Sequence, residues 1–180
     1  MEDLMKDGSQ KVNTQQELHQ EEKRMTEWRF LGGWTDAEFQ DRLNELKKAP
    51  LNFPFEGPDS QAGTNWRRYY SESVVGHEAP GEIVPGGIFE KVWKAIGEYR
   101  FSDPDIVEGH FNPQDELLHR SILLEIKVMG LSFLCGVRVG AIKKDVLKDR
   151  TVYGFRYDTL AGHMETGSEW FLLTKLHDTG

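Results

Sequence analysis

The sequence contains only one cysteine, Cys135, in a chain of 180 residues. A single thiol excludes an internal disulfide, and this composition is typical of a protein in the reducing cytoplasm. Cys135 lies in the apolar stretch 131–139. Because small thiols in apolar surroundings are common in protein cores, we interpret Cys135 as a core residue and not as a nucleophile.

Long apolar runs and runs of basic residues are also missing. No apolar stretch approaches the ~20 residues needed to cross a membrane, and the first residues lack the apolar core of a signal peptide. With 22 basic and 30 acidic side chains, the formal net charge is −8. Net repulsion therefore disfavours nucleic acids and anionic membranes as partners, and we expect no membrane span.

Aromatic residues are absent from residues 1–27, where Gln, Glu, Lys and Asn dominate. The few apolar residues of this segment are too scattered to form one face of a helix. We therefore expect a flexible polar tail over residues 1–27. The remaining residues, 28–180, are enough for a single domain with a substantial core.

The first part of this domain has a short apolar segment and two helical patterns. Residues 28–31 resemble a strand, and Thr35 with Glu38 forms the capping box that starts a helix with an apolar face up to Pro50. Residues 50–65 are rich in Pro, Gly, Asn and Asp, which predicts an irregular connection. Residues 66–75 predict a strand, and residues 88–99, after Pro-Gly-Gly, predict an amphipathic helix.

The second part consists of short extended runs at nearly even spacing, which predicts an antiparallel meander. Apolar and polar residues alternate within these runs, as in a sheet covered mainly on one side. We therefore predict an α+β fold in which a curved antiparallel sheet packs against the amphipathic helix. The five predicted strands are residues 106–111, 121–128, 131–143, 152–160 and 168–176.

This order of elements resembles the helix-grip fold of START-like lipid-transfer domains and polyketide cyclases, a resemblance of topology alone. In that architecture a long C-terminal helix lies across the sheet and closes an apolar cavity. The sequence ends in a turn at residues 177–180. We therefore expect the fold to be incomplete at its C-terminus, with a further strand and helix beyond Gly180, or to cover its bare sheet by self-association.

The segment 154–171 carries the most specific motif of the chain. It contains Gly154-Phe-Arg-Tyr-Asp-Thr-Leu-Ala-Gly-His-Met-Glu-Thr-Gly, followed by Glu169 and Phe171. This segment resembles the signature GFxYxTLxGHxExGxExF of the uncharacterised family called domain of unknown function nineteen-ninety. The resemblance extends more loosely through residues 28–54, 85–87 and 133–139. Family members continue past the position of Gly180 with a strand and a basic, aromatic-rich helix, and the family has no established reaction.

The chemistry of this motif allows two interpretations. His163 and Glu165 lie in the turn between two strands, and together they can act as an acid–base pair. Alternatively, Gly162 and Gly167 permit a tight turn in which the two side chains satisfy backbone groups. His163 and Glu165 with a distant histidine, His77 or His110, can also supply metal ligands, but the spacing matches no metal motif. We therefore expect neither a metal nor another cofactor.

The predicted function is the binding of a hydrophobic or amphipathic small molecule in a cavity between the sheet and the helix 88–99. A first alternative is a cofactor-independent hydrolase, cyclase or lyase that uses His163 and Glu165. A second is a protein-interaction domain that uses its exposed sheet. The predicted ligand-binding residues are Tyr157, Thr159 and Arg138 as polar anchors, with Trp93, Phe155 and Glu169.

Overall fold

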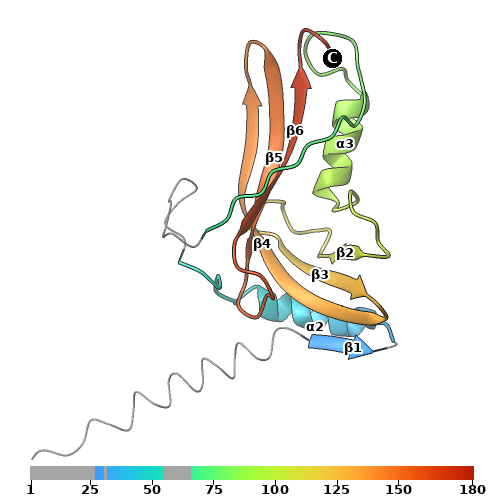
Figure 1. Cartoon of the computed structure of the whole chain (residues 1–180), viewed down its shortest axis with the longest axis vertical. Coiled ribbons are helices and arrows are strands. Elements are labelled where there is room, and N and C mark those ends of the chain that lie inside the picture. The colour runs from blue at the N-terminus through green and yellow to red at the C-terminus, as the bar shows by residue number, and fades with distance from the viewer. Residues whose placement is uncertain (1–26, 31, 55–65) are drawn as a thin grey trace, which may run out of the picture.

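The structure of the protein is a computed structural model, which describes residues 27–30, 32–54 and 66–180 (Figure 1). It confirms the α+β class and the curved antiparallel sheet, while the helix-grip relationship stays a prediction. The predicted tail lies outside the described residues, except that its last residue, Glu27, begins the first strand. The elements are β1 (Glu27–Phe30), α2 (Asp36–Leu46), α3 (Ile88–Gly97), β2 (Val107–His110), β3 (Ser121–Val128), β4 (Leu131–Val146), β5 (Arg150–Thr159) and β6 (Ser168–Leu176).

The strands form one sheet in the order β2-β3-β4-β5-β6, which confirms the predicted meander. Strand β1 pairs with the first residues of β4, from Leu131 to Leu134, and β5 pairs with the later part of β4. A β-bulge between Val139 and Ala141 lies within the part of β4 that pairs with β5. Because a bulge bends and twists its strand, the long strand β4 leads from the lower part of the sheet into the upper part (Figure 1).

The two helices cover opposite faces of this sheet. One core cluster joins α3 to the sheet residues Leu124, Val137 and Phe155, and a second joins α2 to residues such as Leu123 and Leu134. Leu123 and Leu124 are adjacent in β3, point to opposite faces and are only 2% and 3% exposed. The expectation of a sheet covered mainly on one side is therefore wrong for β3, because α2 packs on the second face.

Helix α2 has the predicted capping box. The Glu38 backbone N–H donates to Thr35 Oγ1 at 3.3 Å, and the Thr35 N–H donates to Glu38 Oε2 at 2.8 Å. The buried side chains of Phe39, Leu43 and Leu46 then face the sheet. Local sequence thus determines both the start of this helix and the face that it buries.

Helix α3 begins differently, because its N-cap residue, Gly87, has no side chain to offer. A carboxylate from an earlier segment replaces it: Glu78 Oε1 accepts the Phe89 N–H at 2.7 Å. The other oxygen of Glu78 accepts from the Lys175 ammonium at 2.9 Å, which connects the helix start to β6. A Cβ atom on Gly87 would overlap the Glu78 carboxylate, so this arrangement requires glycine.

The strand predicted over residues 66–75 is wrong, since these residues have no regular secondary structure. The side chains of Tyr69 and Tyr70 are exposed. Composition favoured a strand here, but a strand also needs a neighbour to pair with its backbone groups. Of the predicted connection 50–65, residues 55–65 lie outside the described part of the chain.

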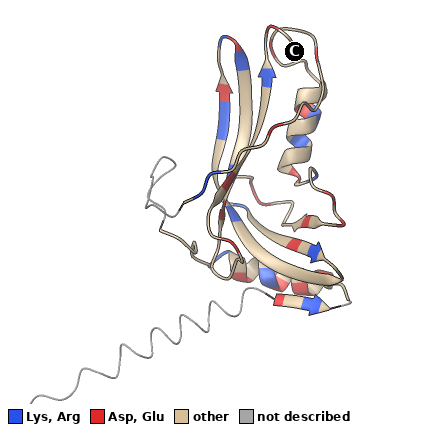
Figure 2. Ribbon diagram, in the orientation of Figure 1, with Lys and Arg blue, Asp and Glu red and all other residues tan. Residues whose placement is uncertain are grey.

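Charged residues of both signs are interspersed along the strands and helices (Figure 2). Many of them pair locally, as Lys127 does with Glu108 at 3.0 Å. Among the helices of the described ranges, none has the length and apolar character needed to cross a membrane.

Candidate functional site

The turn between β5 and β6 carries the most specific motif, and glycines shape it. Gly162 has φ 83° and Gly167 has φ 153°, backbone conformations that other residues rarely adopt. His163 Nδ1 accepts the backbone N–H of Glu165 at 3.0 Å. Burial lowers the pKa of His163 below its ordinary value, so the ring is neutral at pH 7. The His163 ring thus bonds to the backbone of Glu165, while Glu165 itself is exposed.

Thr159 anchors the same turn to the segment that follows α2. Its hydroxyl donates to Asn52 Oδ1 at 2.6 Å and accepts the Gly167 N–H at 2.9 Å. The Asn52 amide in turn donates to the Glu165 carbonyl at 2.8 Å. These contacts give Thr159 a role in holding the turn.

Tyr157 and Glu169 lie opposite each other on β5 and β6. The Tyr157 hydroxyl donates to Glu169 Oε2 at 2.5 Å, and Tyr99, after α3, interacts with the same hydroxyl. Burial raises the pKa of both tyrosines above their ordinary value, and the negative charge of Glu169 adds to this effect. Both phenols are therefore protonated hydrogen-bond donors at neutral pH. We call Tyr99, Tyr157 and Glu169 the tyrosine cluster.

Aromatic rings surround the tyrosine cluster on the α3 face. The Phe171 ring lies 5.3 Å from the rings of both Tyr157 and Phe155, and 4.6 Å from the Phe101 ring, measured between centroids. Phe101 is 41% exposed and Glu169 is also exposed, whereas Tyr157 is 9% exposed. The cluster therefore joins a buried phenol to a surface carboxylate beside an exposed aromatic ring.

The side chain of Tyr99 packs closely on the backbone of Gly109. This residue has φ 54°, which is rare for a tyrosine. Its ring lies over Gly109 of β2, where a Cβ atom would be only 2.5 Å from Tyr99 Cδ1. The bare backbone of Gly109 thus makes room for the ring that contacts Tyr157.

Side chains fill the contact between the body of α3 and the sheet. Phe89 and Trp93 both pack edge-on against Tyr153, at 5.2 and 5.7 Å between ring centroids. Phe155 is 1% exposed and belongs to the same core cluster. Trp93 and Phe155 therefore act as packing residues in this structure.

Arg138 lies on the opposite face of the sheet from Tyr157. Its guanidinium donates to the Leu46 carbonyl at the end of α2, and burial lowers the pKa of Arg138. The structure therefore does not bring Arg138 together with Tyr157 and Glu169, and it gives Arg138 a role at the C-terminus of a helix.

The α2 face holds a polar group that sequence reasoning missed. Glu125 of β3 is 6% exposed, and its carboxylate accepts from Ser132 Oγ at 2.8 Å and contacts His110 Nε2 at 3.3 Å. The Trp34 indole N–H donates to the same Ser132 hydroxyl at 3.0 Å. Alternation in β3 placed Glu125 on the face opposite the main core, but no sequence signal showed that α2 would cover that face.

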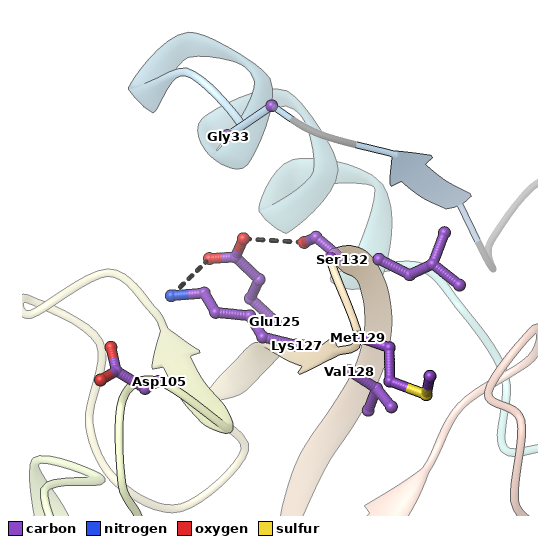
Figure 3. A pocket seen from close by; sticks show the side chains of 10 residues that line it. Gly33, Asp105, Glu125, Lys127, Val128, Met129 and Ser132 are labelled. Carbon is purple, nitrogen blue, oxygen red and sulfur yellow. Dashed lines mark hydrogen bonds and ion pairs between the residues drawn. The ribbon is translucent and has the colours of Figure 1, made fainter.

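A recess of about 400 Å³ opens beside Glu125 (Figure 3). Figure 3 shows Glu125 between Ser132 and Lys127, with the segment around Gly33 above them. A second recess of about 460 Å³ includes His110 and Phe39 in its lining. The contact between His110 and Glu125 thus joins residues that line two different recesses.

Comparison with known proteins relates most of the chain to a protein family. A family model described as Domain of unknown function (DUF1990) matches residues 54–180. No curated protein and no solved structure gives a significant match. The matched range includes the tyrosine cluster, His110 and Glu125.

Proposed function

This chain belongs to the Domain of unknown function (DUF1990) family, a description that assigns no activity, and we propose that the protein binds an amphipathic small molecule at the tyrosine cluster. The observation that carries this proposal is the hydrogen bond between the Tyr157 hydroxyl and the exposed Glu169 carboxylate, beside the exposed ring of Phe101. A few polar groups set among aromatic rings are typical of small-molecule sites.

The groups of the cluster define the chemistry of the ligand. Its apolar part would pack on the exposed ring of Phe101 and on the ring of Phe171, which lies against Phe101. Its polar end would accept from a protonated tyrosine or donate to Glu169. Compared with the site expected from sequence, the proposal keeps Tyr157 and Glu169 and assigns packing roles to Trp93 and Phe155.

A fluorescence titration of the full chain with Nile red, a neutral amphipathic dye with a hydrogen-bond acceptor, tests this proposal. We expect saturable binding that Phe101→Ala weakens by about fivefold, since an aromatic contact of this kind contributes on the order of 1 kcal/mol. His163→Ala serves as the matched control and should change the affinity by less than about threefold. Unsaturable binding, or equal affinities for Phe101→Ala and the wild type, would refute the site.

Native mass spectra of the gently purified protein address the natural ligand. A small molecule that is retained under native conditions and released on denaturation would support the binding function and identify the ligand class. The same preparation of Glu169→Gln should retain less of this molecule, because the variant loses the charge of the exposed carboxylate.

The enzymatic alternative remains a prediction that centres on His163 and Glu165. The neutral ring of His163 is compatible with a general base, but its hydrogen bond goes to the backbone of Glu165. If the alternative holds, His163→Ala abolishes turnover of the bound compound and leaves the melting temperature within about 2 °C. If the turn is structural instead, the same variant lowers the melting temperature.

Self-association has one supporting observation. Leu172 and Leu176 of β6 are exposed on the face opposite α3, and β6 is the last strand of the sheet order. An edge strand with exposed apolar residues favours contact with another chain. Sedimentation of the wild type and of Leu172→Lys tests this: a dimer that the variant converts to monomer supports self-association.

A cytoplasmic location also stays a prediction.

A further inference from the structure

Three side chains with metal-binding atoms come together on the α2 face. Glu108 and Glu125 are directly opposite each other on β2 and β3, and His110 is two residues beyond Glu108. In a pleated sheet such positions share one face. One ligand atom from each of the three residues lies within 4.8 Å of the others. Two paired strands, which are rigid elements, thus set the spacing of the group.

The distances within the group fit a small cation. Two ligands bound tetrahedrally to one zinc ion, each about 2.1 Å from the metal, lie roughly 3.4 Å apart. His110 Nε2 and Glu125 Oε2 are already 3.3 Å apart. The Glu108 side chain is 44% exposed, so a rotation of its carboxylate can complete the third contact without moving the backbone.

Neighbouring residues hold two of these ligands, Glu125 and His110, in fixed orientations. Ser132 Oγ donates to Glu125 Oε1 at 2.8 Å and leaves Oε2 facing His110. The Phe39 ring stacks on the His110 imidazole with 3.8 Å between centroids and an angle of 17°. Fixed orientation of the histidine and of a carboxylate by a second layer of residues is typical of metal sites. The recesses beside Glu125 and His110 offer access from solvent.

Lys127 provides a positive charge in the same place. Its ammonium lies 3.0 Å from Glu108 and 3.5 Å from Glu125, and it is held further by the Pro104 carbonyl at 3.1 Å. The Lys127 side chain is 35% exposed, so it can turn outward to solvent. A bound cation and the Lys127 ammonium would therefore compete for the two carboxylates.

We propose that Glu108, His110 and Glu125 form a binding site for a divalent transition-metal ion, with Lys127 as an intramolecular competitor. One imidazole nitrogen and two carboxylate oxygens suit zinc or cobalt, whereas magnesium and calcium prefer a shell made of oxygens alone. Three protein ligands leave a coordination position for water or for a ligand that enters through a recess. The site lies on the other face of the sheet from the tyrosine cluster and does not depend on the proposed function.

Calorimetric titration of the full chain with zinc chloride, and visible spectroscopy with cobalt chloride, test the proposal. We expect one ion per chain, and a loss of affinity of at least about a hundredfold in His110→Ala and in Glu125→Gln. His77→Ala is the matched control, because this exposed histidine lies outside the group. It should bind as the wild type does, and circular dichroism should show that every variant is folded.

Lys127→Gln separates a metal site from a purely structural salt-bridge network. If an ion competes with the ammonium, the variant should bind zinc about tenfold more tightly than the wild type, since one competing charge is removed. Absence of zinc binding in both the wild type and Lys127→Gln would overturn the proposal. Zinc binding that persists unchanged in His110→Ala would place the ion elsewhere and would overturn it as well.

Discussion

Helix α2 and helix α3 lie on opposite faces of the same sheet, and their N-termini are capped by groups at very different distances along the chain. The cap of α2 comes from Thr35 and Glu38, within the first turn itself. The cap of α3 comes from Glu78, which in turn contacts Lys175 of β6. Helix α2 therefore has a start signal of its own, whereas the start of α3 depends on the assembled domain.

The polar groups of the two faces show a second contrast. On the α3 face, Tyr157 and Glu169 pair across adjacent strands within the motif that the sequence displays. On the α2 face, His110 and Glu125 meet beneath a helix that begins about 70 residues earlier. The residues of the two pairs are 12 and 15 positions apart along the chain, so what only the fold decides is that α2 covers the second pair.

Glu78→Ala should cause the largest change and would test the remote cap directly. The variant leaves the Lys175 ammonium, which is 3% exposed, without its carboxylate, and it removes the acceptor for the Phe89 N–H. We expect the melting temperature to fall by roughly 10 °C. Glu90→Ala, which alters an exposed carboxylate in the first turn of the same helix, should lower it by less than about 2 °C.

Gly87→Ala should have the next largest effect, because the new methyl group would overlap the Glu78 carboxylate and approach the Val84 carbonyl. Overpacking of this kind costs about 2 kcal/mol in the free energy of unfolding. Gly97→Ala is the control within α3, since a Cβ atom there meets nothing within 4 Å. Urea denaturation should show the control to be as stable as the wild type or more so; equal stability of the two variants would contradict the proposed cap.

Thr35→Ala should have a smaller effect, of about 1 kcal/mol, because it removes one side of a local capping box. Helix α2 keeps its buried face and the contact of Arg138 with the Leu46 carbonyl. Chemical denaturation measures the loss, and Thr35→Ser should restore most of the stability. A loss as large as that of Glu78→Ala would show that the two helix starts are equally dependent on their caps.

Acid should weaken both caps, because it protonates the carboxylates of Glu38 and Glu78. Near neutral pH, where both groups are ionised, the stability of the protein should hardly change with pH. Hydrogen bonding to Arg29 lowers the pKa of Glu38 from 4.5 to about 2, and the Phe89 N–H followed by Lys175 lowers the pKa of Glu78. A lowered pKa means that the folded state binds fewer protons than the unfolded state, so stability is present above pH 4.5 and is lost as the pH falls toward 2. Thermal melts of Glu38→Gln should depend less on pH in this window.

Sequence reasoning predicted elements better than it predicted contacts. The capping box at Thr35, the helix after Gly87 and the five-strand meander are all present, because each depends on periodicity or on residues a few positions apart. The strand expected over residues 66–75 is absent, because a strand is defined by its partner as much as by its composition.

The candidate sites show the same limit. Tyr157 and Glu169 were predicted close together, since both flank one turn, and they form a hydrogen bond. Arg138 was expected near them, but alternation alone does not say which face of a sheet is inward, and this residue points to α2 instead. His110 was considered only as a distant metal ligand for His163, because the sequence did not show that α2 would bury Glu125 beside it.

By itself, the sequence determined the class of fold, the face that each helix buries and the glycine-shaped turn at Gly162 and Gly167, since each follows from local geometry. Only the tertiary structure decided that Glu78 caps a helix, that Glu125 is buried beside His110, and that Arg138 and Tyr157 are on opposite faces. The physical reason is that burial and hydrogen-bond partners depend on which elements pack together, and this information is distributed over the whole chain.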